Sequence, residues 1–430
     1  MVEENSNMIL DTGDKPSSLR WILLALQHVC AMFGATILVP IVVNTTAGAN
    51  ILSIPVTLVS SGLGTLIYLI CTRNRSPVYL GSSFAFITLM AAGYAIGGAG
   101  SVFTALMIVG IVYVIISLII RVFGPEWINK LLPPIVVGPM IIVIGLSSAP
   151  AAIQQIGLDL TFVPWTNLLV ASISFLITAI VAVRGRGILK VIPILLGIIV
   201  GYIAAALIGI VDFAPLWSAH LIEVPKFNLP IINYDLNFAA VFTIVPITLA
   251  TVVEHIGDHK VLSEIIDRDL IEDPGLQKTL LGDGLATFLA AFLGGPANTT
   301  YGENTSVVGM TRVASTYVIG LAAVITIIFA FSGHLTALLT AIPQPVLGGI
   351  SILLYGFICV NGLKILIHNQ VDFNNTKNVV VAATMLVLGL GGASLSIVYG
   401  DLSISISGMS LAAIVGVLLN QLLPEEKHDL

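Results

Sequence analysis

Long apolar runs recur along the whole chain and constrain its fold more than any other feature of the sequence. Stretches of about 18–24 apolar residues alternate with short polar segments, and a helix of that length crosses about 30 Å of hydrocarbon. Charged residues make up only 9% of the 430 residues and gather mainly between these runs. A soluble domain of this length carries roughly 25% charged residues. The chain is therefore expected to be an all-α polytopic membrane protein.

Composition also excludes several functional classes. The formal net charge is −6, and no basic patch with interleaved aromatic residues is found, so no nucleic-acid partner is expected. No metal-ligand cluster and no nucleophile–base pair stands out, so neither an enzyme nor a metal or cofactor site is predicted. The first nineteen residues lack the basic and apolar regions of a cleavable signal peptide. Cys30, Cys71 and Cys359 show no CxxC spacing and are expected to be unpaired packing residues.

The pattern predicts fourteen membrane segments with both termini in the cytoplasm. The third and tenth are short, contain glycine and are interrupted by Ser, Thr or Asn. The fourteen ranges are 21–43, 51–71, 78–95, 102–121, 131–149, 165–183, 191–211, 238–257, 277–294, 299–312, 316–332, 343–361, 377–393 and 408–423.

Charge placement supports this number of segments. With this topology, sixteen of the seventeen Lys and Arg residues lie on the inner side, and only Lys226 lies outside. Omitting the third or the tenth segment alone inverts every later loop and destroys the bias. Both irregular segments must therefore change sides. Because lipid cannot satisfy freed backbone groups, they must be shielded by protein or line a cavity.

The two halves of the chain match at three landmarks that occur in the same order. Seven segments in each half is an odd number, so the second half enters the membrane from the opposite face. This is the inverted repeat of many secondary transporters, although chance similarity among Gly- and Pro-rich helices is the alternative. The matching landmarks are Gln27-His28 with Glu254-His255, Gly81–Phe84 with Thr300–Glu303, and Leu132–Gly138 with Ile342–Gly348.

Short, interrupted segments in matching positions predict where a transporter binds its substrate. A half-helix that begins inside the membrane presents unpaired backbone N–H groups and the positive end of its dipole. These groups suit the carbonyl oxygens of a polar uncharged ligand as well as an anion. The third and tenth segments are therefore the predicted binding region.

Only two carboxylates are predicted to lie away from the segment ends, and each is a candidate for function. Glu254 lies in the inner part of the eighth segment, and Glu303 lies at the break in the tenth. An apolar surrounding disfavours a charged carboxylate, so Glu254 is expected to exchange a proton near neutral pH. The alternatives are an end-cap that reaches cytoplasmic water for Glu254 and a helix-capping role for Glu303.

Other polar and aromatic residues near these segments leave two interpretations open. His28 and His255 are either proton relays or hydrogen-bonded packing residues. Asp258 lies one turn after Glu254 on the same helix face. It either shares a proton with Glu254 or begins a solvated cytoplasmic loop over residues 258–278. Phe84 and Tyr355 either pack in the core or stack on a planar ligand.

Five motifs give the chain a specific resemblance. The runs Leu26–His28, Ala31–Thr36, Tyr79–Phe86, Glu254–Gly257 and Asn298–Asn304 resemble those of bacterial uracil:proton symporters, in the nucleobase–cation symporter-2 (nucleobase–ascorbate transporter) family. The similarity extends from about residue 26 to residue 422, and the Tyr-Gly-Glu-Asn run with Glu-His-x-Gly is its most specific part. Related purine transporters typically carry Gln in place of Glu303, which favours a pyrimidine substrate.

The resemblance implies an architecture and an assembly. Segments 1–4 (21–121) and 8–11 (238–332) form a core domain, and segments 5–7 (126–211) and 12–14 (343–423) form a gate domain, after a cytoplasmic tail over residues 1–20. Segments three and ten pair as short antiparallel strands that precede half-helices. A homodimer through the gate domain, in contact with lipid in the cell membrane, is also implied.

The resemblance also implies a set of site residues. Glu254 and Glu303 accept hydrogen bonds from uracil, while the backbone N–H groups of Phe84 and Gly302 donate to its carbonyls. This arrangement matches the two donors and two acceptors of uracil. The implied walls of the pocket are Ala35, Phe84, Tyr301 and Tyr355.

One position departs from the pattern of the family. Many uracil symporters have His four residues after the Glu of the eighth segment, where this chain has Asp258 followed by His259. Glu254, His255 and Asp258 are the candidates for proton coupling. The predicted function is import of uracil coupled to entry of protons. A purine or urate transporter of the same family, and an anion transporter of the same fold, are the alternatives.

Overall fold

Apolar helices form most of the protein. In the computed structural model, residues 8–229, 235–399 and 402–424 are described, and within them seven helical stretches are long and apolar enough to cross a membrane. These are α1 (Ser18–Ala47), α2 (Ile54–Cys71), η1 with α3 (Phe84–Phe86 and Ile87–Phe123), α5 (Pro134–Ile156), α6 (Trp165–Arg184), α10 to α11 (Phe238–Ile244, η3 Val245–Ile247, Thr248–Ile266) and α16 (Gln344–His368). Shorter apolar helices are α7 (Pro193–Ile208), α14 (Thr316–Ala330), α17 (Thr376–Leu390) and α18 (Gly408–Leu422).

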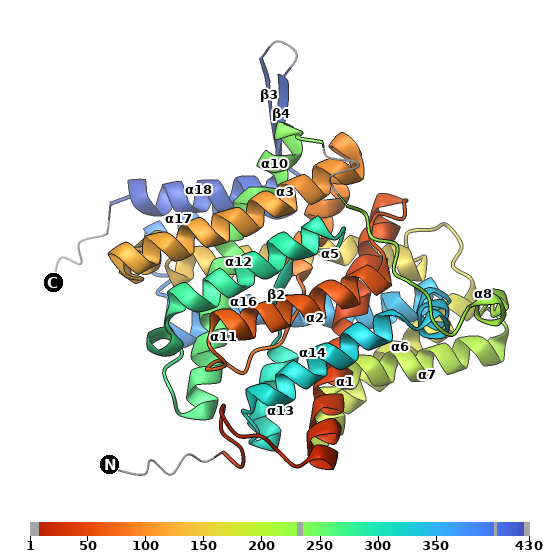
Figure 1. Ribbon diagram of the computed structural model, residues 1–430. Coiled ribbons are helices and arrows are strands. Elements are labelled where there is room, and N and C mark those ends of the chain that lie inside the picture. Colours follow the sequence, from red (N-terminus) through yellow and green to blue (C-terminus); the bar gives the residue numbers. More distant parts are fainter. Residues whose placement is uncertain (1–7, 230–234, 400–401, 425–430) are drawn as a thin grey trace.

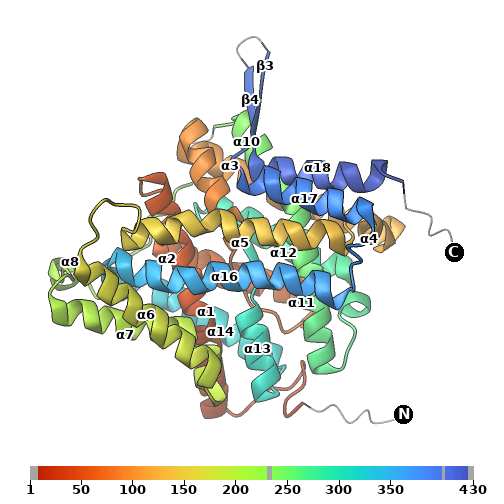
Figure 2. The ribbon, with the colours of Figure 1, turned by 180° about the vertical axis from the view of Figure 1, so that it is seen from behind.

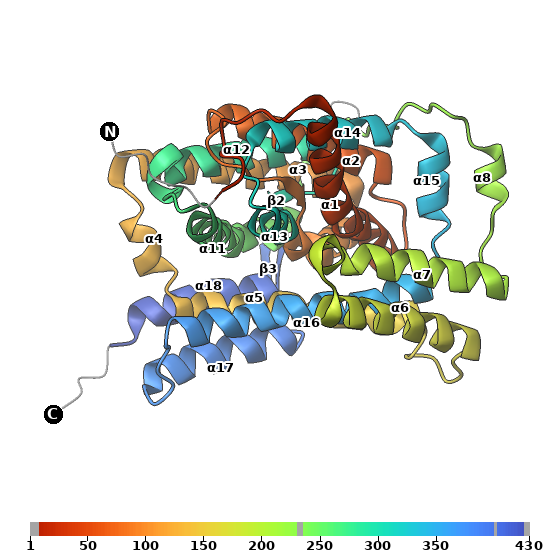
Figure 3. The same cartoon turned by 90° about the horizontal axis from the view of Figure 1, so that it is seen from below.

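The helices are arranged in two layers, which are seen edge-on in Figure 3. The first layer contains α1, α2, α3, α11 and α14, together with α12 (Leu276–Phe292) and α13 (Gly302–Thr311). The second layer contains α5, α6, α7, α16, α17 and α18. Within the first layer α12 packs against α3 and α2, and within the second α5 lies along α16 (Figures 1 and 2). Each layer therefore combines helices from both halves of the chain.

Paired glycines bring helices into close contact within each layer. A Cβ on Gly110 of α3 would lie 2.7 Å from the carbonyl oxygen of Gly284 in α12. A Cβ on Gly362 of α16 would lie 2.6 Å from the carbonyl oxygen of Gly138 in α5. In lipid, helix association depends on such close packing because the hydrophobic effect between helices is absent. These two contacts explain why glycine is required at the centres of both layers.

The predicted third and fourth segments join in one helical stretch. After β1 (Leu80–Ser82) and η1, helix α3 continues to Phe123, with a break at Gly97 and Gly98. Gly98 has φ +75°, a left-handed conformation that glycine adopts without steric cost. The predicted third and fourth segments are therefore separated by a sharp kink at these two glycines.

Helix α11 extends further than predicted. The sequence suggested a solvated loop over residues 258–278, but α11 continues to Ile266 and includes Asp258 and His259. His259 is fully buried, so the loop interpretation is wrong for this part. The polar residues remain helical because they find hydrogen-bond partners inside the protein, which the local sequence does not reveal. A π-type turn, η4 (Ile271–Gly275), then leads into α12.

A β-hairpin that was not predicted projects from the helices. Strands β3 (Ser394–Tyr399) and β4 (Leu402–Ser407) pair antiparallel, with Ser394 opposite Ser407 and Tyr399 opposite Leu402. The hairpin extends beyond the helical layers in Figure 1. Serine alternates with apolar residues throughout β4 and in the first four residues of β3, and that period of two is typical of a β-strand. The signal was therefore present in the stretch between the last two predicted segments.

Residues 9–14, before α1, pack on the first layer. The backbone N–H of Ile9 donates to the carbonyl of Arg312 at 2.7 Å, and that of Ala314 donates to the carbonyl of Leu10 at 2.8 Å. Thr316 donates to the carbonyl of Thr12 through its hydroxyl, also at 2.8 Å. The segment thus covers the junction between α13 and α14.

Within the described residues, short helices also lie in connections. Helix α4 (Glu126–Leu131) precedes α5, and η2 (Gly187–Val191) lies between α6 and α7. Helix α8 (Ala214–Ser218) follows α7, and α15 (Gly333–Thr340) lies between α14 and α16.

Candidate functional site

Two short strands from opposite halves of the chain meet inside the first layer. Strand β1 pairs antiparallel with β2 (Asn298–Thr300), with Leu80 opposite Thr300 and Ser82 opposite Asn298. The backbone N–H of Tyr301 extends the pairing by donating to the carbonyl of Tyr79 at 3.1 Å. All six strand residues are buried, so their backbone groups need this pairing. The strand pairing expected for these segments is confirmed.

A helix begins immediately after each strand. Phe84 opens η1 and leads into α3, while Gly302 opens α13. The residues before them, Ser83 and Tyr301, make no side-chain capping hydrogen bond. Neither N-cap side chain therefore occupies the N–H of Phe84 or of Gly302, and both helix ends carry partial positive charge. Gly302 is exposed, and a Cβ added there would meet no atom within 4 Å.

Tyr301 is held firmly between these elements. Its hydroxyl donates to the carbonyl of Ser82 at 3.0 Å and accepts from the hydroxyl of Thr36 at 3.2 Å. Its ring lies over Gly81, where an added Cβ would be 2.2 Å from a ring carbon. Ala35, beside Thr36 in α1, is 1% exposed. Tyr301 thus joins α1, the strand pair and α13 at the predicted site.

Three carboxyl groups gather beside the helix ends, and we call Glu254, Asp258 and Glu303 the acid cluster. Glu254 and Asp258 are one turn apart on α11, and Glu303 lies in the first turn of α13. All three are half-buried and act on one another electrostatically. Asp258 accepts a hydrogen bond from the hydroxyl of Thr300 in β2. Asp258, at the position where the sequence departs from the family pattern, therefore belongs to the candidate site.

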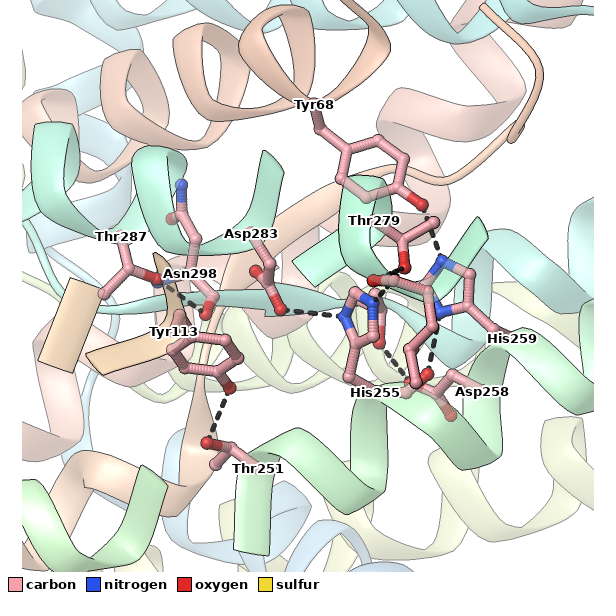
Figure 4. A network of polar contacts seen from close by, with 12 residues as sticks. Tyr68, Tyr113, Thr251, His255, Asp258, His259, Thr279, Asp283, Thr287 and Asn298 are labelled. Carbon is pink, nitrogen blue, oxygen red and sulfur yellow. Dashed lines mark hydrogen bonds and ion pairs between the residues drawn. The ribbon is translucent and has the colours of Figure 1, made fainter. Parts of the chain in front are cut away.

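His255, also on α11, points toward α12 (Figure 4). Its Nδ1 lies 2.9 Å from a carboxyl oxygen of Asp283, and its Nε2 lies 3.0 Å from the hydroxyl of Thr279. The imidazole of His259 stacks on that of His255 with centroids 4.1 Å apart. His259 also contacts the hydroxyl of Tyr68 at 2.6 Å. All five side chains are fully buried.

Sequence reasoning missed Asp283, His259 and Tyr68. It predicted only two carboxylates away from the segment ends, but Asp283 is 0% exposed in the middle of α12. The available signal was an acidic residue between two glycines in an apolar segment. An ionisable residue inside a membrane segment is a candidate for function. His259 and Tyr68 gave no local signal because their partners come from other helices.

The remaining predicted residues lie in different surroundings. His28 is 1% exposed and accepts a hydrogen bond at Nδ1 from the side-chain amide of Asn304 at 3.1 Å. This contact matches the packing interpretation of His28. Tyr355 is 2% exposed in α16, within the second layer. It therefore lies in the layer opposite the acid cluster.

A cavity of about 970 Å³ lies away from these residues. It is lined by the C-terminal end of α1, the following loop, residues 223–228 and the start of α16. None of the predicted site residues lines it. Its size alone does not make it the site, because the helix ends and the acid cluster lie elsewhere. Within the described ranges, no group of three or more His, Cys, Asp or Glu residues is arranged to hold a metal ion.

Comparison with solved structures shows the same fold in anion transporters. The transmembrane domain of the cyanobacterial bicarbonate transporter BicA matches with a TM-score of 0.60, covering 97% of this chain and 99% of that one. SLC26A9 matches with a TM-score of 0.66, covering 95% of this chain and 66% of that one. Sequence identity is only 14% and 12%, so the likeness concerns the fold alone.

Sequence comparisons are more specific. The chain is 47% identical to a uracil permease of Bacillus caldolyticus, over 97% of this chain and 95% of that protein. It is 44% identical to a uracil permease of Bacillus subtilis and 37% identical to one of Escherichia coli, with 98% and 97% of this chain covered and 96% of each relative. Residues 19–398 match the profile of the Permease family. These similarities confirm the resemblance inferred from the motifs, and the chain belongs to the Permease family.

Proposed function

We propose that this protein is a secondary active transporter that imports uracil together with protons. Membership of the Permease family and the transporter relatives indicate a transporter rather than an enzyme. The observation that carries the choice of uracil is the 47% identity to a uracil permease over nearly the full length of both chains. The acid cluster beside two helix N-termini gives that choice a chemical basis.

The proposed architecture has fourteen membrane segments in a seven-plus-seven inverted repeat. The core domain comprises residues 21–121 and 238–332, and the gate domain comprises residues 126–211 and 343–423. Pairing of a strand from each half and the two helical layers support this division. The protein is placed in the cell membrane with both termini in the cytoplasm, because this topology puts sixteen of seventeen basic residues inside.

The proposed binding mode satisfies every polar group of uracil. The two N–H groups of the base donate to Glu254 and Glu303. Its two carbonyls accept hydrogen bonds from the backbone N–H groups of Phe84 and Gly302, which have no capping partner. A site of this kind discriminates strongly, because an analogue that lacks one group leaves a buried partner unpaired. Ala35, Tyr301, Tyr355 and the ring of Phe84 form the walls.

Of the three candidates for proton coupling, Glu254 and Asp258 are assigned the exchange of the proton, and His255, next to Glu254 on α11, is assigned a supporting role. Three neighbouring carboxylates cannot all be ionised cheaply in a poorly hydrated site, so the acid cluster takes up a proton. Protonated Glu254 favours binding of uracil from the outside. Movement of the core domain against the gate domain then opens the site to the inside, where the proton leaves and affinity falls. The coupling requires this difference in proton affinity between the two states.

Uptake into liposomes tests the proposed function. Purified protein in liposomes should accumulate labelled uracil when the outside is more acidic than the inside, and a protonophore should abolish the accumulation. Equal uptake with and without the gradient would exclude proton coupling. Competition by excess unlabelled bases tests the substrate, and stronger competition by xanthine or urate than by uracil would favour the purine alternative.

We also propose a homodimer through the gate domain, with the outer surface in contact with lipid. Helices α6 and α7 carry large exposed apolar side chains, including Leu176 at 53% and Ile203 at 53%. Apolar surfaces of this kind pack against lipid or a second copy. Native mass spectrometry from detergent should show twice the mass of the chain, and a monomer under conditions that preserve uracil binding would contradict the dimer.

A further inference from the structure

His255 and Asp283 form a buried pair outside the acid cluster. Both side chains are 0% exposed, and they join α11, which carries Glu254, to α12. Hydrogen-bond directions around the two residues determine how many protons the pair holds.

Thr279 fixes the proton on one nitrogen of His255. The hydroxyl of Thr279 lies 3.0 Å from the carbonyl oxygen of Leu276, which can only accept, and we assign the single hydroxyl proton to this contact. With that assignment, the same hydroxyl, 3.0 Å from Nε2 of His255, accepts from it. His255 consequently carries a proton on Nε2.

One further proton must lie between His255 and Asp283. Nδ1 of His255 and a carboxyl oxygen of Asp283 are 2.9 Å apart, which is a hydrogen-bonding distance. With Nε2 already protonated, a neutral imidazole can only accept at Nδ1, so Asp283 must donate as a carboxylic acid. The alternative is an ion pair, in which Nδ1 is also protonated and Asp283 is ionised. In either form the pair has no net charge.

The surroundings favour the uncharged form. Among the described residues, the second carboxyl oxygen of Asp283 has no hydrogen-bond donor. Within the same residues, no Lys or Arg side chain forms a salt bridge with Asp283. A buried ion pair is stable only when further hydrogen bonds satisfy its remaining lone pairs. An ionised Asp283 would therefore lie in an interior that does not compensate its charge.

The groups that face Asp283 from neighbouring helices add no positive charge. Tyr68 of α2, Tyr113 of α3, and Glu254 and Asp258 of α11 lie within electrostatic reach of it. His259 is neutral in this arrangement, because its Nδ1 donates to the carbonyl of His255 and its Nε2 accepts from Tyr68. Each of these groups is neutral or acidic, so an ionised Asp283 would gain no attraction from them.

We propose that Asp283 is a positioning residue that remains protonated and donates to His255, and that this neutral pair fixes α11, and with it Glu254, against α12. This role rests on the proposed function, because Asp283 would support the position of Glu254 in the proposed uracil site. The pair supplies a directional contact between two helices without placing a charge in the interior. The proton of this pair is a resident one, distinct from the proton that Glu254 exchanges.

Infrared spectroscopy tests the protonation state and requires no uracil. At neutral pH, the difference spectrum between the wild type and Asp283→Asn should show loss of a carboxylic acid C=O band. Loss of a carboxylate band instead would overturn the proposal in favour of an ion pair. Glu264→Gln, which changes an exposed acid on α11, should show loss of a carboxylate band and serves as the control. Failure of the uracil assignment leaves this result unaffected.

Binding of labelled uracil tests the positioning role. The amide of Asp283→Asn can still donate to His255, so its affinity should stay within about threefold of the wild type. Asp283→Leu leaves His255 without its donor and should weaken binding roughly tenfold or more. Loss of binding in the Asn variant, with the fold retained, would contradict a neutral donor at this position. If the Leu variant fails to fold, the Asn variant and the infrared spectrum still decide the question.

Discussion

Glu254 has the features expected of the residue that exchanges the transported proton. It lies beside Asp258 and Glu303, and it is half-buried on α11 in the first layer. Glu254→Gln keeps the shape of the side chain but cannot ionise, so uptake driven by a proton gradient should be lost. Transport assays in liposomes check this result, with Glu264→Gln as the matched control on the exposed face of the same helix. A Gln variant that still concentrates uracil would exclude Glu254 as the proton carrier.

The hydrogen bond from Thr300 to Asp258 offers a second test at the residue scale. Thr300→Val is nearly isosteric and removes the donor, and hydrogen bonds to charged groups contribute about 1.5–3 kcal/mol. Uracil affinity should fall roughly tenfold, as measured by equilibrium binding.

Thr299 provides an internal control for that experiment. It precedes Thr300 in the same strand and is also buried, but its hydroxyl has no hydrogen-bond partner among the described residues. Thr299→Val should therefore leave affinity unchanged. Equal losses in the two variants would show that the strand, rather than the contact with Asp258, is sensitive to the change.

At the scale of elements, two glycines in the strand–helix units should respond in opposite ways. A Cβ at Gly81 would overlap the ring of Tyr301, whereas one at Gly302 would meet open space. Gly81→Ala should lower the Tm by several degrees, in keeping with a destabilisation of about 1–3 kcal/mol from overpacking. Gly302→Ala should keep the Tm and weaken uracil binding, since the methyl group enters the proposed site.

Thermal unfolding and equilibrium binding, measured on the same preparations, check this contrast. An unchanged Tm in Gly81→Ala would show that Tyr301 can move away from the strand. Wild-type affinity in Gly302→Ala would place the ligand away from this helix end.

The elements also show how far sequence patterns can predict structure. The apolar runs locate the helices, and the interrupted third and tenth segments locate the strand pair, because hydropathy and glycine placement are local signals. The course of α11 beyond residue 257 depended on partners for His259 that come from α2. The pair of His255 with Asp283 likewise joins two helices that hydropathy treats separately. Contacts of this kind require the tertiary structure.

For the whole molecule, alternating access requires one layer to move against the other. Thr45 at the end of α1 and Gln344 at the start of α16 form a hydrogen bond of 3.3 Å between the layers. In a background without Cys30, Cys71 and Cys359, cysteines at these two positions should be joined by a short reducible thiol cross-linker. Uptake of uracil should then fall to background and return on reduction, while single-cysteine variants remain active.

Transport at the normal rate by fully cross-linked protein would mean that these helix ends do not separate in the cycle.

The proposed number and orientation of the membrane segments are also properties of the whole molecule. They rest on the distribution of Lys and Arg, a property of the entire sequence that no individual helix reveals.

The strand pair has a consequence for biosynthesis. Its two strands are 220 positions apart in the sequence, at Leu80 and Thr300. Ribosomes add about 5–20 residues per second, so roughly 10–40 seconds pass between synthesis of the two strands. During that interval the first strand has no partner, and lipid cannot satisfy its backbone groups. The nascent first half must therefore be sheltered at the insertion machinery until the second half arrives.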